Sequence, residues 1–93
     1  MNSISHTFNV DDRVKYPRVV ENRDASGMPS IICETSGTVT QIVDDLIIFK
    51  VELIFVYQKG YREMGITLPK NKNQIECLSA DDLGITHETR TGN

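Results

Sequence analysis

The sequence predicts a mainly β protein, built as a small bent antiparallel sheet or a partly open barrel of about five strands. It also predicts one short helical turn near the C-terminus, and an α+β fold is the alternative. The chain has ten Ile and eight Val against five Leu and two Ala, and branching at Cβ favours strands over helices. In the run Leu46–Tyr57 only Lys50 and Glu52 are polar. The 93 residues fit a single domain.

The first predicted strand lies in residues 8–16, where the apolar side chains fall on even positions and so share one face. These side chains are Phe8, Val10, Val14 and Tyr16. The pair Asp11-Asp12 interrupts the row and predicts a turn or bulge. Pro17 is expected to stop or redirect the strand, because it lacks an N–H for the sheet.

The segment 17–27 allows two interpretations. Pro17 at a first helical position and Gly27 just past the last one are typical of a helix. However, only Val19 and Val20 are substantial apolar residues in this segment, and adjacent residues do not form a helical stripe. We therefore favour an irregular or extended excursion over a helix.

Two further strands are predicted before the long apolar run, at 31–33 and at 38–43. Gly37 is expected to form a turn or bulge ahead of the second strand. Asp44-Asp45 is the predicted tip of a hairpin. Asp-Asp is a weaker tight turn than Asp-Gly, because the second central position of such a turn favours a positive φ. The loop length and the register of the 38–57 hairpin therefore stay open.

The run Leu46–Tyr57 is predicted to be one strand, because a helix would not segregate its side chains. Its odd positions carry large apolar groups and are expected to face the core. Twelve residues would span ~40 Å, so the strand must bend or project. The even positions are apolar at both ends and charged in the middle, and they need cover from the chain or from a second copy. This side is the predicted interface: Leu46, Ile48, Lys50, Glu52, Ile54 and Val56.

Beyond the long strand, residues 63–68 and 75–78 are predicted to form short strands on either side of a polar loop. Residues 79–84 are predicted to form one capped helical turn, in which Ser79 accepts a hydrogen bond from the amide of Asp82. The expected organisation is a flexible N-terminus at 1–7, a single β-domain at 8–84 and a flexible C-terminal tail at 85–93.

Charge and cysteine content narrow the class of protein. The net charge of −3 disfavours general, charge-driven nucleic-acid binding. Cys33 and Cys77 lie far apart with no CxxC or zinc-ligand spacing, so both are expected to be free, buried thiols. No signal peptide is recognisable, and the apolar run is shorter than the roughly twenty residues of a membrane-spanning helix. We expect a cytoplasmic protein with no membrane association, no metal and no cofactor.

Histidines and acidic pairs give no catalytic signature. His6 and His87 are expected to be exposed and idle. The doublets Asp11-Asp12, Asp44-Asp45 and Asp81-Asp82 could bind a cation or transfer protons, but turn and cap chemistry explains them more simply. No residue is therefore predicted to be catalytic, and an enzyme is the less favoured class.

Two stretches combine basic and aromatic residues, at 13–23 and 57–72. Such a combination on a small barrel can bind single-stranded nucleic acid, although a solvated surface of mixed charge is the simpler interpretation. The residues that would form this alternative site are Arg13, Lys15, Tyr16, Arg18, Tyr57, Lys59, Tyr61 and Arg62.

In sequence order, the motifs Asp12-Arg13-Val14, Gly37-Thr38-Val39 and Ile75–Leu83 resemble those of Src-homology-type small β-barrels, which implies a barrel-like fold and no particular function. The first two also look like the opening and middle of type II dihydrofolate reductases, which are tetrameric small barrels. As a compact domain without motif signatures, the chain is also similar to hypothetical proteins carried on mobile elements such as integron gene cassettes.

The function predicted from these features is that of a non-enzymatic small β-domain that self-associates, as a dimer, and binds a protein partner. The two-sided apolar strand motivates this prediction. One alternative is a nucleic-acid-binding module that uses the basic and aromatic stretches. Another is a small-molecule-binding barrel whose site lies at a subunit junction.

Overall fold

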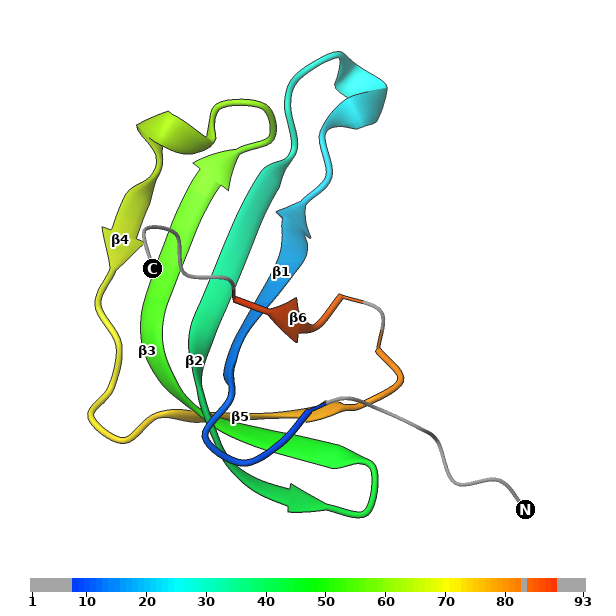
Figure 1. The fold of residues 1–93 in the computed structure, drawn as a ribbon. Helices are drawn as coiled ribbons and strands as arrows, with labels where there is room; N and C mark the ends of the chain where they lie inside the picture. Colours follow the sequence, from blue (N-terminus) through cyan, green and yellow to red (C-terminus); the bar gives the residue numbers. More distant parts are fainter. Residues whose placement is uncertain (1–7, 83, 89–93) are drawn as a thin grey trace.

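The computed structural model describes residues 8–82 and 84–88. It confirms a mainly β fold: one antiparallel sheet of six strands, in the order β4-β3-β2-β1-β6, with β5 also paired to β3 (Figure 1). The sheet does not close into a barrel, and the helical segments among the described residues are two 3₁₀ turns. The elements are β1 (Arg13–Glu21), η1 (Asp24–Ser26), β2 (Ile31–Val43), β3 (Leu46–Gln58), η2 (Arg62–Met64), β4 (Ile66–Leu68), β5 (Ile75–Ser79) and β6 (Thr86–His87).

The long apolar run is a single strand, as predicted. β3 pairs with β2 along its length, from Val43↔Leu46 to Ile31↔Gln58. Its first part, Leu46–Lys50, also pairs with β5, whereas Ile54–Val56 pairs with β4. The strand bends between these two partners (Figure 1). The bend lets a 13-residue strand fit a chain of this size.

The bend divides the molecule into two parts. We call the closed half the part near the hairpin tip: residues 37–51 of β2 and β3 with the start of β1, β5 and β6. The open half comprises residues 16–21, 31–36 and 53–58 with η1, η2 and β4. The lower part of Figure 1 is the closed half, where the hairpin curls beneath β1, and the upper part is the open half.

A bulge at Glu52 reverses the side-chain alternation of β3. Ser36 pairs with Leu53 but its neighbour Gly37 pairs with Val51, so Glu52 is the extra residue. The odd positions face the core up to Val51, as predicted. From Leu53 onward the prediction is wrong: Leu53 is 40% exposed, and Ile54 packs against the core instead.

Gly37 lies opposite this bulge, in agreement with its predicted role. A Cβ at this position would lie 1.8 Å from the carbonyl oxygen of Lys50. Only glycine allows the two backbones to approach this closely. As a result, β2 continues through Gly37 as one strand, rather than as the two predicted strands.

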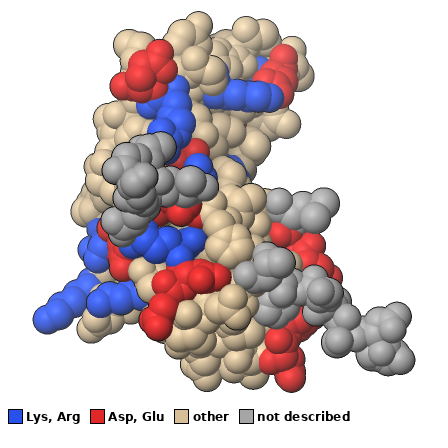
Figure 2. Space-filling view, in the orientation of Figure 1, with Lys and Arg blue, Asp and Glu red and all other residues tan. Residues whose placement is uncertain are grey.

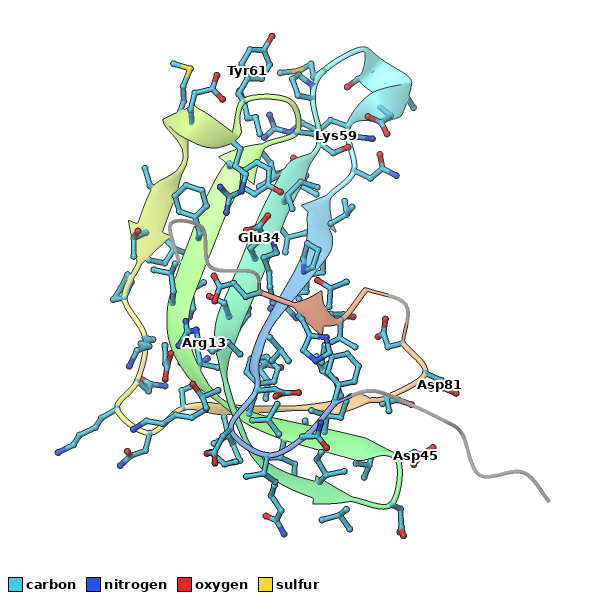
Figure 3. All side chains as sticks on the ribbon, viewed as in Figure 1. Arg13, Glu34, Asp45, Lys59, Tyr61 and Asp81 are labelled. Atoms are coloured by element: carbon cyan, nitrogen blue, oxygen red, sulfur yellow. The ribbon has the colours of Figure 1, made fainter. Side chains whose placement is uncertain are left out.

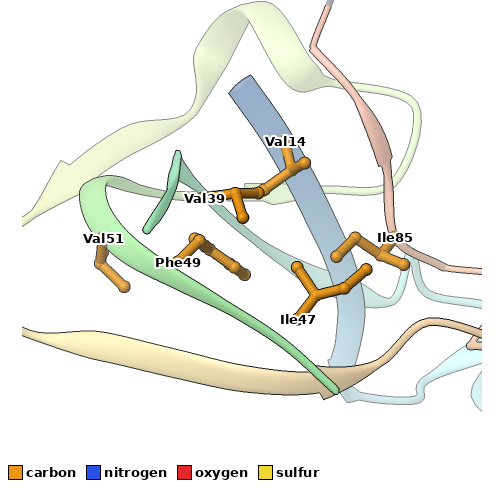
Figure 4. Close-up of a cluster of buried hydrophobic side chains, with 6 residues drawn as sticks. All are labelled: Val14, Val39, Ile47, Phe49, Val51 and Ile85. Carbon is orange, nitrogen blue, oxygen red and sulfur yellow. The ribbon is translucent and has the colours of Figure 1, made fainter. Parts of the chain in front are cut away.

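The apolar core lies in the closed half (Figure 4). It consists of buried β-strand side chains and one residue from the segment after β5: Val14, Val39, Ile47, Phe49, Val51 and Ile85. Phe49 and Ile47 are fully buried. These residues come from four separate segments of the chain, so the core forms only when the hairpin folds over β1.

β1 continues through Pro17 to Glu21, so the predicted stop at Pro17 is wrong. Among the described residues, β6 pairs with β1 only at Val14 and Lys15. Beyond these residues β1 is an edge strand, where the missing N–H of proline costs no ladder hydrogen bond. The favoured extended form of segment 17–27 is therefore found as far as Glu21, and η1 follows.

The hairpin tip is a two-residue loop, and Asp44 adopts a φ of 55°. Aspartate tolerates this left-handed conformation better than most residues. The predicted turn near Asp11-Asp12 is also present, with Asp11 at a φ of 78°. At residues 80–82 the structure has a turn rather than the predicted helical turn, and the amide of Asp82 donates to the backbone oxygen of Ser79, not to its hydroxyl.

The folded unit extends beyond the predicted boundary at residue 84. Ile85 is buried in the core, and Thr86–His87 form β6. Residues 85–88 therefore belong to the domain, because burial of Ile85 holds them against β1. The expected flexible segment 1–7 and the remainder of the expected tail, 89–93, lie outside the described residues.

Candidate interaction surfaces

An apolar patch lies on the outer side of the closed half. Paired residues of antiparallel strands point to the same face, and the core residues Ile47 and Phe49 alternate with outward-facing neighbours. The register therefore places one row of apolar side chains on the outside. We call this row the β3–β5 patch, and it consists of Val43, Leu46, Ile48, Ile75 and Cys77. Ile75 at one end of this row is 60% exposed and Leu46 at the other end 42%, so the row leaves apolar surface open to solvent.

Opposite charges flank the two ends of this patch. The hairpin tip carries Asp44 and Asp45, and a hydrogen bond from the amide of Ala80 to the carbonyl of Asp45 brings Asp81 to the same end. Figure 3 shows Asp45 and Asp81 close together there. At the other end Lys50 pairs with Ile75, close to the loop that carries Lys70 and Lys72. In Figure 2 basic side chains project at the lower left and acidic ones at the lower right.

The six residues of the predicted interface do not form one surface. Leu46 and Ile48 belong to the β3–β5 patch, and Lys50 flanks one end of it. Glu52 sits at the bulge, where it forms an ion pair with Arg13 and accepts a hydrogen bond from the Thr38 hydroxyl at 2.9 Å. The remaining two, Ile54 and Val56, lie on the core side of β3 because the bulge reverses the alternation.

A second apolar surface is a groove of about 330 Å³ in the open half. Pairing of Val56 with Ile66 places these two side chains on one face of the sheet. The groove is lined by Ile31, Val56, Tyr57, Gln58, Tyr61, Met64 and Ile66. Met64 and Ile66 are largely exposed, because Met64 ends the short turn η2 and Ile66 begins β4, a three-residue edge strand.

The opposite face of the open half carries a buried carboxylate. Glu34 is the fourth residue of β2 and its side chain is 9% exposed. The Tyr57 hydroxyl donates to its Oε2 at 2.8 Å. Arg62 donates from Nη2 to Oε1 at 2.8 Å and from Nε to Oε2 at 3.2 Å. The Arg62 guanidinium also lies over two rings, 5.2 Å from the centroid of Phe55 and 5.8 Å from that of Tyr57.

These contacts shift the titration of the groups involved. The hydrogen bonds from Arg62 hold the pKa of Glu34 below its ordinary value of 4.5, against the opposing effect of burial. Burial raises the pKa of the Tyr57 hydroxyl, and the bond to Glu34 raises it further. Glu34 is therefore a carboxylate held ionised in the sheet by an arginine. Neither periodicity nor residue spacing predicted this cluster; the sequence signal is that Glu34 is the one charged residue of β2.

The structure distributes the predicted nucleic-acid residues between the two halves. Arg13 is engaged by Glu52 and, at 2.9 Å, by Glu88. Arg62 is engaged by Glu34. The hydroxyl of Tyr16 donates to Asp82 at 3.0 Å, so this ring serves a structural contact. Lys15 is half-buried, whereas the other three side chains are exposed: Arg18, Lys59 and Tyr61. Figure 2 shows basic and acidic groups interspersed across this face, which is not the continuous basic surface that the nucleic-acid alternative requires.

His87 is not idle, contrary to the prediction. Its Nε2 lies 3.0 Å from Oδ2 of Asp12, and its ring stacks on Phe8 with centroids 4.6 Å apart. The amide of Asn9 and the contact with His87 lower the pKa of Asp12. These contacts attach β6 to the segment before β1. His6 lies outside the described residues.

The cysteines differ from each other, since Cys33 is buried as predicted while Cys77 is exposed. Across residues 8–82 and 84–88, no group of three or more His, Cys, Asp or Glu side chains is arranged to hold a metal ion. In the same part of the chain, no helix has the length and apolar character needed to cross a membrane.

Comparison of the chain with protein-family models, curated proteins and solved structures finds no match. The resemblances to Src-homology-type barrels, type II dihydrofolate reductases and mobile-element proteins therefore stay predictions. Inferences about function must come from the surfaces described above.

Proposed function

We propose that this chain is a small β-domain that acts by binding rather than catalysis, and that two copies associate through their β3–β5 patches. The observation that carries the proposal is the row of exposed apolar side chains on the outer side of β2, β3 and β5. Large apolar groups that remain exposed side by side usually mark an interface. Two of the six predicted interface residues belong to this patch, Leu46 and Ile48, and a third, Lys50, flanks it.

The charges at the ends of the patch favour a second copy as its occupant. In a two-fold dimer the same surface serves both subunits, and each end of one patch meets the opposite end of the other. An axis near Ile48 would bring Lys50 of one copy toward the acidic hairpin tip of its partner. The arrangement is self-complementary, and two copies facing the same way would place like charges together.

The mass in solution tests this proposal. Light scattering from about 1 to about 200 µM is expected to give twice the 10.5 kDa of one chain. Ile75→Lys should shift the mass toward the monomer, because it places a charge in the patch beside Lys50. Val19→Lys, a change of similarly exposed valine on β1, should leave the dimer intact. A 10.5 kDa particle at every concentration, or equal loss of dimer in both variants, would contradict the proposal.

Cys77 provides a direct measure of which surfaces meet. A short bis-maleimide cross-linker should join two copies through Cys77, because it lies in the patch and is exposed. Cys33→Ser should cross-link as the unchanged protein does, and Cys77→Ser should not cross-link. Absence of a covalent dimer from a protein that scatters light as a dimer would place the interface elsewhere.

A further partner, whether a protein, a nucleic acid or a small molecule at the subunit junction, stays a prediction. Of these, nucleic-acid binding has the least support from the geometry, because Arg13 and Arg62 are already paired with carboxylates. Titration of the protein with single-stranded and duplex oligonucleotides at low ionic strength tests it.

A further inference from the structure

We infer that Glu34, Phe55 and Tyr57 form a binding site for a guanidinium group, which Arg62 occupies in this structure and which an arginine side chain of another molecule can enter in its place. The site lies in the open half, away from the β3–β5 patch. The inference is therefore independent of the proposed dimer. It rests on three observations: the burial of the carboxylate, the position of its partner, and the shape of the site.

The first observation is that Glu34 keeps a charge where an apolar side chain would be less costly. β2 is the central strand, and the Glu34 side chain is 9% exposed. Removing a carboxylate from water costs several kcal/mol, and a buried ion pair is often no more stable than an apolar replacement of the same size. Ionisable groups held in buried positions are concentrated at functional sites, which makes Glu34 a candidate for recognition.

The second observation is that the counter-charge comes from one of the least buried elements of the molecule. Arg62 lies in η2, which has no buried residue, and its side chain is 58% exposed. The carboxylate is thus fixed in the sheet, whereas the arginine approaches it from the surface. If Arg62 moves away, its guanidinium becomes solvated, and only Glu34 loses its compensation.

The third observation is that the site fits a guanidinium in particular. Two nitrogen atoms of Arg62 donate hydrogen bonds to the two oxygen atoms of Glu34. This bidentate geometry requires a planar guanidinium, and a lysine ammonium cannot reproduce it. Phe55 and Tyr57 supply ring faces for the cation. The Tyr57 hydroxyl orients Oε2 through its own bond. Glu34, Phe55 and Tyr57, which surround the guanidinium, all belong to the strands β2 and β3.

Arg62 competes with any external arginine because it is tethered nearby. A tethered group acts at an effective concentration of the order of millimolar. An external ligand must exceed this concentration or make additional contacts. Removal of the Arg62 side chain should therefore reveal the site to small ligands.

The test uses Arg62→Ala and methylguanidinium chloride at millimolar concentrations, with sodium chloride at equal ionic strength as the reference. The melting temperature of Arg62→Ala should rise and saturate with methylguanidinium. It should not rise in this way in Arg62→Ala/Glu34→Gln or in the wild-type protein. If Arg62→Ala does not fold in buffer, the same titration is followed by circular dichroism as recovery of β structure. Equal responses in the single and double variants would overturn the inference.

A second measurement asks whether an arginine from another molecule fits. N-acetyl-arginine amide should bind Arg62→Ala, and bind wild-type protein at least about 10-fold more weakly because of the tethered competitor. N-acetyl-lysine amide should bind either protein more weakly than the arginine compound binds Arg62→Ala. If methylguanidinium stabilises Arg62→Ala but the arginine compound binds no more tightly than the lysine compound, the site is a structural ion pair. That result would overturn the inference that an arginine of another molecule can enter it.

Discussion

The closed and open halves of this domain share two strands and are stabilised differently. In the closed half, β2 and β3 curl beneath β1 and enclose six apolar side chains, among them the fully buried Phe49. In the open half the same two strands form a single layer, and beside the apolar Ile32 and Cys33 the buried side chains include the polar ones of Glu34, Thr35 and Ser36. A single layer has no second layer to build an extensive apolar core against. It relies on strand pairing and on polar contacts, and it leaves chemical groups accessible to other molecules.

The largest expected change in the free energy of unfolding comes from the core of the closed half. Phe49→Ala should lower the free energy of unfolding by about 3–5 kcal/mol, because it leaves a cavity in the closed core. The control Ile66→Ala removes an exposed side chain in the open half and should change it by no more than about 0.5 kcal/mol. Urea denaturation followed by circular dichroism measures both. Comparable losses in the two variants would show that the core does not dominate stability.

The junction between the halves is tested at Gly37. Gly37→Ala should cost about 1–3 kcal/mol or more, because the added Cβ collides with the Lys50 carbonyl and displaces the bulge. Gly60→Ala is the matched control, since no atom lies within 4 Å of its Cβ. There the strain of a positive φ, about 1–2 kcal/mol, is the remaining cost. A smaller loss for Gly37→Ala than for Gly60→Ala would contradict the close approach.

The ion pairs Arg62–Glu34 and Arg13–Glu52 should also differ in how much they contribute to stability. Arg62→Ala leaves Glu34 buried without its partner and should cost about 1.5–3 kcal/mol. Arg13 and Glu52 are both partly exposed, so Glu52→Gln should cost only about 0.2–1 kcal/mol. Glu34→Gln should cost less than Arg62→Ala, because the arginine that remains is solvated. These values come from urea denaturation at neutral pH, and the reverse order for the two open-half variants would refute the asymmetry.

The smallest expected effect is a dependence on pH. The folded-state pKa of Glu34 is lowered by Arg62, so this pair stabilises the fold above pH 4.5 and the contribution is lost as the pH falls through the lowered pKa. The difference in unfolding free energy between wild-type protein and Glu34→Gln should therefore shrink from about pH 7 to about pH 3. Denaturation at several pH values measures this difference. A difference that stays constant or grows on acidification would argue that Glu34 is not ionised in the fold.

Much of the fold could be predicted from local patterns. The branched apolar composition indicated strands, the uninterrupted run identified β3, and Asp44-Asp45 and Gly37 marked the turn and the bulge. The predictions failed where distant contacts decide. Pro17 does not stop β1, because its free edge requires no N–H there. Residue 85 does not begin a tail, because Ile85 fills a gap in a core formed by other segments.

The candidate sites were less predictable than the fold. The six-residue interface assumed a strict alternation along β3, and one extra residue at Glu52 divides it between two faces. The β3–β5 patch required knowledge that Ile75 and Cys77 lie beside Lys50 and Ile48. The guanidinium site required Glu34 and Arg62, 28 positions apart, to meet. No local pattern along the chain indicates that residues so far apart in sequence meet in the fold.

By itself the sequence determined that this protein is a β-domain with one long central hairpin, because side-chain branching and periodicity act on each residue and its nearest neighbours. Only the tertiary structure decided which side of each strand is covered, which apolar row stays exposed and which charge is buried. The physical reason is that burial depends on what lies across a strand, and a single bulge or a distant loop changes it without any change in local preference.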